Sequence, residues 1–159
     1  NSPLEYTPDV VGDRTVVLTT TNGTRALQKS LRAQHVLTGA FLNGARCAKT
    51  CAQFKRDVVI ICAGTQDVFS LEDGLCAGMI VDELLRLCED PPVVGDLGLA
   101  MQYAYTCRKH DLEQVLLQCA SGTRLCKLGN KSDVLYCARL NVSDTVPVLV
   151  DNALQPLRF

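Results

Sequence analysis

Hydroxyl, amide and guanidinium groups follow one another from Thr20 to Arg25, in the order Thr-Thr-Asn-Gly-Thr-Arg. They come after an apolar, β-branched run at residues 15–20 and before a helical pattern at residues 24–31, which predicts a turn from a buried strand into a helix. The free N–H groups at such a helix start face one point and attract an anion. Gly23 lets the backbone approach that anion closely, and the planar guanidinium can hold two of its oxygens. The residues therefore predict a cradle for phosphate or sulfonate.

A structural alternative for the cradle stays open. An Asn-Gly pair is a common turn, and Thr24 could do no more than cap the helix that follows it. These residues alone favour neither interpretation, so the decision depends on which other groups lie at the same edge of the sheet.

Two adjacent carboxylates, Glu72 and Asp73, follow the loop after a second apolar run at residues 57–62. This order places them near the carboxyl end of a predicted strand, where a hard cation could bridge carboxylate and phosphate oxygens. Magnesium is the natural candidate. The alternative is a plain helix start, in which Ser70 caps the helix and the two acids complement its dipole without binding a ligand.

Cysteine is the remaining residue type that could do chemistry. Cys62 ends the run at residues 57–62, where a thiol of lowered pKa could be a nucleophile, although packing is the commoner role. The nine cysteines are an odd number without a Cys-x-x-Cys pair, so neither a disulfide framework nor a zinc site is predicted. Cys47 and Cys51 lie four apart on a predicted helix and would need two more ligands to hold a metal. We expect mostly buried free thiols; zinc or iron in the purified protein would instead favour a redox or metal store.

The elements that must position these groups alternate between strands and helices along the chain. Strands are predicted at residues 15–20, 35–39, 57–62 and 146–150, and helices at residues 24–31, 43–54, 74–88 and 133–140. Residues 96–128 are also predicted to be helical, with a break at Ser121-Gly122. Because parallel strands need crossover connections, this order predicts one α/β domain, residues 1–159, with a mainly parallel sheet covered by helices on both faces. Ligands of such sheets bind at the carboxyl ends of the strands.

Composition excludes several classes of function. The 16 basic and 17 acidic residues are scattered, so no basic stripe suits nucleic acid. No apolar run approaches the roughly 20 residues that a membrane helix needs, and the start has neither the charge nor the apolar stretch of a signal peptide. We therefore predict a cytoplasmic protein without a membrane or nucleic-acid partner. Because the chain starts at Asn1 without a methionine, we expect upstream sequence to be missing.

Several segments, in order and spacing, resemble the 2-phosphosulfolactate phosphatase family. They are Asn1-Ser2-Pro3, Leu18 to Ala26, Cys62-Ala63-Gly64, and Ser70 to Asp73 followed by Ala77-Gly78. Less distinctive matches continue through Gly122 to Leu125, Asp133 to Cys137 and Val146 to Leu149, so the resemblance spans essentially the whole chain. It implies a three-layer α/β/α fold with a mainly parallel or mixed sheet. It also implies a magnesium-dependent hydrolase that converts 2-phospho-3-sulfolactate to 3-sulfolactate and phosphate in the coenzyme M pathway.

The resemblance gives roles to the residues singled out above. Phosphate or sulfonate binding is expected of Thr20, Thr21, Asn22, Gly23 and Thr24. Charge neutralisation is expected of Arg25, and magnesium binding or activation of water of Glu72 and Asp73. Cys62 and Asn1 are secondary candidates that would line the same edge.

Partners follow from the same resemblance. The substrate is expected to be a small phosphorylated and sulfonated acid. Members of the family have a further N-terminal portion that is absent here, so a missing segment or a second chain is expected to complete the site, and a homodimer is the default assembly. If that portion carries the catalytic groups, the alternative function is a non-catalytic module that binds a phosphorylated or sulfonated metabolite.

Overall fold

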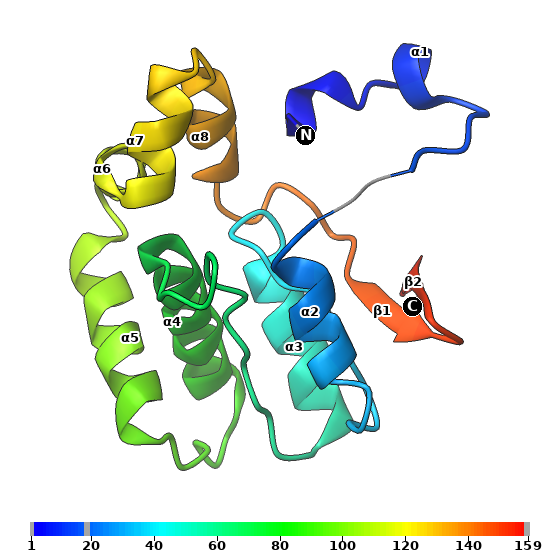
Figure 1. Ribbon diagram of the computed structural model, residues 1–159. Helices are drawn as coiled ribbons and strands as arrows, with labels where there is room; N and C mark the ends of the chain where they lie inside the picture. Colours follow the sequence, from blue (N-terminus) through cyan, green and yellow to red (C-terminus); the bar gives the residue numbers. More distant parts are fainter. Residues whose placement is uncertain (1, 18–19, 158–159) are drawn as a thin grey trace.

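The computed structural model describes residues 2–17 and 20–157. Within this part of the chain, helices dominate and one small sheet forms (Figure 1). The helices are η1 (Pro3–Glu5), α1 (Pro8–Val11), α2 (Gly23–Lys29), α3 (Gly44–Phe54), α4 (Leu71–Leu87), α5 (Asp96–Arg108), α6 (Leu112–Gln118), α7 (Ala120–Lys127) and α8 (Lys131–Cys137). The strands are β1 (Pro147–Val150) and β2 (Ala153–Pro156). No helix in the described ranges is long and apolar enough to cross a membrane.

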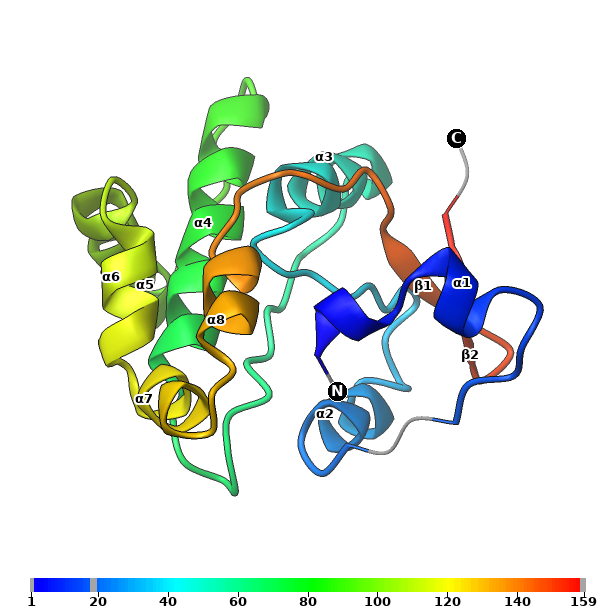
Figure 2. The same ribbon diagram turned by 90° about the horizontal axis from the view of Figure 1, so that it is seen from above.

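Helix α4 is the centre of the packing because it is apolar on two faces. Leu75 and Met79 join a cluster with residues of α5, α6 and α8, whereas Ile80 and Leu84 join a second cluster with α3. Figures 1 and 2 show α5 beside α4 on one side, α3 on the other, and α6 to α8 grouped at one end. The N-terminus of α4 is therefore held firmly by the core, and the residues of its first turn have fixed positions.

Gly78 marks the place where α4 and α5 cross. A β-carbon at this position would collide with the backbone carbonyl of Met101, which cannot move without shifting α5. We expect Gly78→Ala to lower the free energy of unfolding by about 1–3 kcal/mol, measured by urea denaturation. Gly95→Ala is the matched control, because a β-carbon at Gly95 meets nothing within 4 Å. Equal denaturation midpoints for the two variants would contradict this account of the crossing.

The predicted combination of helices and strands is confirmed, but most of the individual strands are not. The prediction at residues 146–150 is confirmed by β1, which pairs antiparallel with β2 through a turn at Asp151 and Asn152. The predicted strand at residues 35–39 is reduced to one bridge, Leu37 to Val148. Residues 57–62, and the described part of residues 15–20, form no strand; residues 18–19 lie outside the described ranges.

Residues 57–62 and the described part of residues 15–20 form no strand because no described segment pairs with their backbone. A β-branched run has the local preference of a strand, but a strand exists only where a second segment pairs with its backbone. The described residues therefore form no parallel sheet, and the three-layer arrangement stays a prediction. The predicted helical stretch at residues 96–128 is confirmed as helical, but it is divided into α5, α6 and α7, with breaks before Leu112 and at Cys119 instead of at Ser121-Gly122.

Candidate functional site

The loop of residues 63–70, here called the linking loop, joins the two groups of residues that the sequence singles out. At one end, Gly64 N donates to Asp73 Oδ2 on α4 at 2.7 Å. Further along, Gln66 N donates to Asn22 Oδ1 at the start of α2 at 3.2 Å. The linking loop thus connects the start of α2 to Asp73 through these two hydrogen bonds.

The cradle itself is built by a local exchange of hydrogen bonds. Thr24 N donates to Thr20 Oγ1 at 3.4 Å, and Thr24 Oγ1 donates back to Thr20 O at 2.9 Å. The capping hydroxyl is therefore that of Thr20, whereas Thr24 was the cap in the structural alternative. Thr21 and Arg25 are exposed, and Gly23 is half-buried. These groups form a shallow, open surface at which a small anion would meet hydroxyls, backbone N–H groups and a guanidinium.

Arg25 already holds a carboxylate in this structure. Its Nη2 lies 3.0 Å from Asp67 Oδ1 and its Nη1 lies 3.3 Å from Asp67 Oδ2, so both nitrogens of the fork are engaged. The two side chains are 51% and 74% exposed, and an ion pair this open contributes at most about 1 kcal/mol. An anion with a second negative charge and the same pair of oxygens could therefore displace Asp67.

The linking loop holds Asp67 in place by an unusual backbone turn. Thr65 and Val68 exchange two backbone hydrogen bonds of 2.9 and 3.0 Å, and the two residues between them have φ values of 52° and 62°. Neither Gln66 nor Asp67 is a glycine, so this left-handed conformation costs free energy that the surrounding contacts must offset. The turn is what directs the Asp67 carboxylate toward Arg25.

Asp73 is the more constrained of the two acids. It is half-buried, and burial raises the pKa of its carboxyl group; the hydrogen bonds from Gly64 and Ala63 oppose this shift and the charge of Glu72 adds to it. Glu72 lies instead against Cys119, at the junction of α6 and α7, where it reinforces the rise that burial causes in the pKa of the Cys119 thiol. The two carboxylates thus contact different neighbours and do not form a common pair.

Ser70 does not cap α4 with its side chain. Its hydroxyl instead lies 3.0 Å from Thr65 Oγ1 and shares a hydrogen bond with it. The alternative of a plain helix start is therefore wrong in its Ser70 cap, whereas its two acids do lie in the first turn of α4. Asp73 is in addition hydrogen-bonded to the linking loop.

Cys62 lacks the property that a thiolate nucleophile requires. Its pKa is raised, first by burial and then by the charge of Asp73, so the thiol form predominates at neutral pH. The Cys76 thiol is also neutral at this pH, because burial raises its pKa to about 12. Of the nine free cysteines, only Cys47, Cys51 and Cys119 are buried, fewer than the sequence led us to expect. Within the described ranges, no three cysteine, histidine or acidic residues gather closely enough to hold a metal.

A magnesium ion would fit this site through one carboxylate. The Asp73 carboxylate accepts hydrogen bonds from the backbone N–H groups of Gly64 and Ala63, and it keeps further lone pairs that could bind a cation. Magnesium is often bound by one or two carboxylates together with water and substrate phosphate oxygens. Asp73 suits this kind of ion, whereas Glu72 is turned toward Cys119. Asn1 lies outside the described residues.

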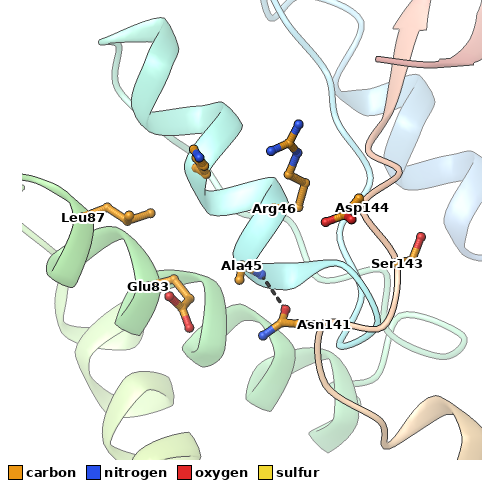
Figure 3. A pocket seen from close by; sticks show the side chains of 8 residues that line it. Ala45, Arg46, Glu83, Leu87, Asn141, Ser143 and Asp144 are labelled. Atoms are coloured by element: carbon orange, nitrogen blue, oxygen red, sulfur yellow. Dashed lines mark hydrogen bonds between the residues drawn. The ribbon is translucent and has the colours of Figure 1, made fainter. Parts of the chain in front are cut away.

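The place where the linking loop contacts Asn22, Arg25 and Asp73 is here called the junction. Two open hollows lie away from it. One, of about 270 Å³, is formed by α3, α4 and the segment before β1 (Figure 3). There Ala45 N donates to Asn141 Oδ1 at 2.9 Å, and the wall combines basic and acidic side chains: Arg46, Lys49, Glu83 and Asp144. The other, of about 340 Å³, lies beside residues 38–43. Neither hollow is lined by a residue that the sequence predicts for the site.

Gln66 and Asp67 are the site residues that sequence reasoning missed. Both lie between Gly64 and Ser70, in a stretch whose polar residues have no familiar motif. A short loop between an apolar run and a predicted helix is the signal that could have found them, because such loops lie at the carboxyl edge of a sheet.

The family model and the relatives that match this chain have the same description. A family model described as 2-phosphosulpholactate phosphatase matches residues 1–152. A relative from Clostridium novyi, named probable 2-phosphosulfolactate phosphatase, is 37% identical over 147 residues, which are 92% of this chain and 61% of the relative. Relatives of the same name from Symbiobacterium thermophilum and Caldanaerobacter subterraneus are 39% and 38% identical, over 95% and 94% of this chain and 64% and 61% of their own.

The chain thus spans less than two thirds of the length of these relatives. The match covers both groups of residues that the linking loop brings together, and it confirms the resemblance carried by the cradle and the segment around Asp73. The chain belongs to the 2-phosphosulfolactate phosphatase family.

Proposed function

We propose that this chain carries the phosphate-binding part of a magnesium-dependent phosphatase. The substrate would be 2-phospho-3-sulfolactate, or a related phosphorylated 2-hydroxy acid, and the products 3-sulfolactate and phosphate. The observation that carries the proposal is the junction itself: the linking loop holds Asn22 and Arg25 of α2 and Asp73 of α4 at one place. Membership in the family, whose relatives are named for 2-phosphosulfolactate, supports this choice of substrate.

The phosphate group would take the position of the Asp67 carboxylate on Arg25. Both ligands offer two oxygens to the planar guanidinium, and a phosphate monoester has the greater charge. The hydroxyls of Thr20 and Thr21 and the backbone at Gly23 would then surround the remaining oxygens. The Thr24 hydroxyl, which donates to Thr20 O, would join them by exchanging that hydrogen bond for one to phosphate. Asn22 would act indirectly, because its side chain is bonded to the linking loop. Most of the catalysis in phosphoryl transfer is positioning and charge neutralisation of this kind.

Asp73 would handle the proton of the attacking water. A half-buried carboxylate with a raised pKa is a stronger base than an exposed one. As the water oxygen bonds to phosphorus, Asp73 takes its proton; the ester bond breaks, and the departing 2-oxygen of sulfolactate takes a proton from solvent. Bound magnesium would neutralise charge on the phosphate oxygens. Glu72 would contribute at longer range, and Cys62 would line the site as a neutral thiol.

Family membership also supports a wider set of proposals that rest on it alone. These are a place in coenzyme M synthesis, a cytoplasmic location, a homodimer and a three-layer fold in the protein of full family length. The part of the relatives' length that this chain does not match would then complete the site.

Release of phosphate from racemic phosphosulfolactate tests the function directly. We would compare this 159-residue chain with the complete gene product, each with and without magnesium. Turnover that requires magnesium is the expected result for the complete protein, and Asp73→Ala should abolish the magnesium dependence whereas Glu72→Ala should retain part of it. If neither protein releases phosphate, the proposed phosphatase activity is rejected.

The alternative is a non-catalytic module that binds a phosphorylated or sulfonated metabolite. The observation that favours it is the presence of the cradle in a chain that matches less than two thirds of its relatives. Calorimetric binding of phosphosulfolactate without phosphate release, in the complete gene product, would establish this alternative.

Asp67 should weaken substrate binding, because it competes for Arg25. We expect Asp67→Asn to lower the Kd for inorganic phosphate by about twofold to fivefold, since the competing pair contributes at most about 1 kcal/mol. Titration calorimetry at low ionic strength measures the change. Asp9→Asn, on α1, is the control for the loss of one surface charge. Equal affinities of the Asp67 variant and the parent chain would mean that the phosphate does not bind at Arg25.

A further inference from the structure

Residues 57–62 form a segment with the local properties of a β-strand, and no segment among residues 2–17 and 20–157 pairs with it as a strand. Four consecutive β-branched residues, Val58 to Ile61, have the highest preference for strands of any residue type. In both views the segment runs from the end of α3 toward the start of α4 without a helical turn, and β1 and β2 lie away from it (Figures 1 and 2). We refer to it as the open segment.

The backbone of the open segment is not used by the rest of the described chain. Within residues 2–17 and 20–157, none of its backbone N–H or C=O groups takes part in a backbone hydrogen bond. An unpaired row of donors and acceptors is a template for another strand. The open segment contains neither proline nor glycine, so every residue could join a ladder.

One side chain of the open segment reaches the core, and the other five are exposed. Ile60 packs against the cluster that contains Cys47 and Ile80. Its neighbours point the other way: Val59 is 83% exposed and Ile61 is 50% exposed. Exposed β-branched residues next to an unpaired backbone promote aggregation, so natural proteins cover such edges.

We propose that the open segment is the acceptor site for an added β-strand, supplied by the part of the family's length that this chain does not match. More than a third of each relative lies outside the match, which is enough polypeptide for several strands. The added strand would pair its backbone with residues 57–62 and place apolar side chains over Val59 and Ile61. This inference rests on family membership and does not depend on turnover.

The position of the open segment connects it to the site. Its last residue, Cys62, is followed by Ala63 and Gly64, whose backbone N–H groups bind the Asp73 carboxylate. A strand added at residues 57–62 would therefore fix the start of the linking loop. The added strand would stabilise the geometry of the site without contributing a side chain to it.

Amide hydrogen exchange tests the proposal with overlapping synthetic peptides that tile the unmatched part of the Symbiobacterium thermophilum relative. We expect one peptide to bind this chain with one-to-one stoichiometry and to slow exchange at residues 57–62 at least tenfold. If no peptide slows exchange there, the proposal is wrong. Slowing that instead grows with the concentration of the chain alone would identify a second copy as the occupant and also overturn it.

Two surface variants distinguish strand addition at residues 57–62 from nonspecific binding to exposed apolar side chains. Val59→Lys should weaken binding of that peptide by at least about tenfold, because a charge replaces the apolar contact. Val93→Lys is the control, since Val93 is fully exposed in the connection between α4 and α5. Both variants should unfold at the denaturant concentration of the parent chain. Unchanged peptide binding by the Val59 variant would reject the assigned site.

Discussion

Arg25→Ala should reduce kcat/KM for phosphosulfolactate by about 100-fold in the complete gene product, mostly through a higher KM. The guanidinium is the one side chain of the cradle that carries a full positive charge, and it is already shaped around two carboxylate oxygens. Alanine leaves the phosphate with neutral donors only. Steady-state kinetics of phosphate release measures the effect.

Two companion variants show whether the loss belongs to the guanidinium. Lys29→Ala removes a basic residue from the same helix, one turn further on, and should leave kcat/KM within about twofold. Arg25→Lys keeps the charge but loses the fork, and should recover only part of the activity. The Arg25–Asp67 pair is exposed, so its loss should change the free energy of unfolding by less than about 1 kcal/mol. Kinetics of Arg25→Ala equal to those of the parent would remove Arg25 from the site.

The helices were largely predictable because their information is local. Residues 43–54 and 74–88 have apolar side chains at helical spacing, and α3 and α4 begin and end within three residues of those limits. The run at residues 96–128 keeps the same spacing, but its breaks depend on single backbone positions. Cys119, with ψ of 163°, is extended and accepts a hydrogen bond from Gly122 N, which starts a new helix.

The strands were less predictable because pairing is not a local property. The apolar runs at residues 15–20 and 57–62 specify a preference for strands, but they do not say which segment supplies the neighbour. The bridge from Leu37 to Val148 joins segments more than a hundred residues apart in sequence. No periodicity in either segment encodes that contact.

The candidate site has some features that local sequence predicts and others that depend on contacts between distant segments. The cradle and Asp73 could be named from their positions between apolar runs and helices, but the sheet edge at which they were expected to meet is not formed by the described residues. The partner of Arg25 could not be named, since Asp67 lies 42 residues along the chain and reaches Arg25 only through a turn with two left-handed residues. Glu72 could not be placed either: adjacency in sequence suggested a ligand shared with Asp73, but neighbouring residues on a helix point about 100° apart, and Glu72 contacts Cys119.

Asp73→Asn should lower kcat at least 100-fold while leaving the fold intact. Asparagine keeps an oxygen that can accept the hydrogen bond from Gly64 N, so the start of the linking loop is preserved. It cannot take a proton from water, and its neutral amide is a poorer magnesium ligand than a carboxylate. Phosphate release at saturating substrate and magnesium measures the loss. Glu72→Gln, the adjacent acid that contacts Cys119, should retain most of the activity.

The stability of the same variant distinguishes a catalytic acid from a structural one. Because burial raises the pKa of Asp73 in the folded chain, its ionised form is disfavoured there relative to the unfolded chain. The free energy of unfolding of the parent chain therefore decreases as pH rises from the pKa of Asp73 in the unfolded chain to its higher pKa in the folded chain. The asparagine variant does not titrate and avoids this decrease. We expect Asp73→Asn to be as stable as the parent in acid, where both side chains are neutral, and equally or more stable at pH 7. Urea denaturation at both pH values measures this. A variant that is less stable at pH 7 would mean that the Asp73 carboxylate holds the loop through its charge, and a loss of turnover would then reflect a displaced site.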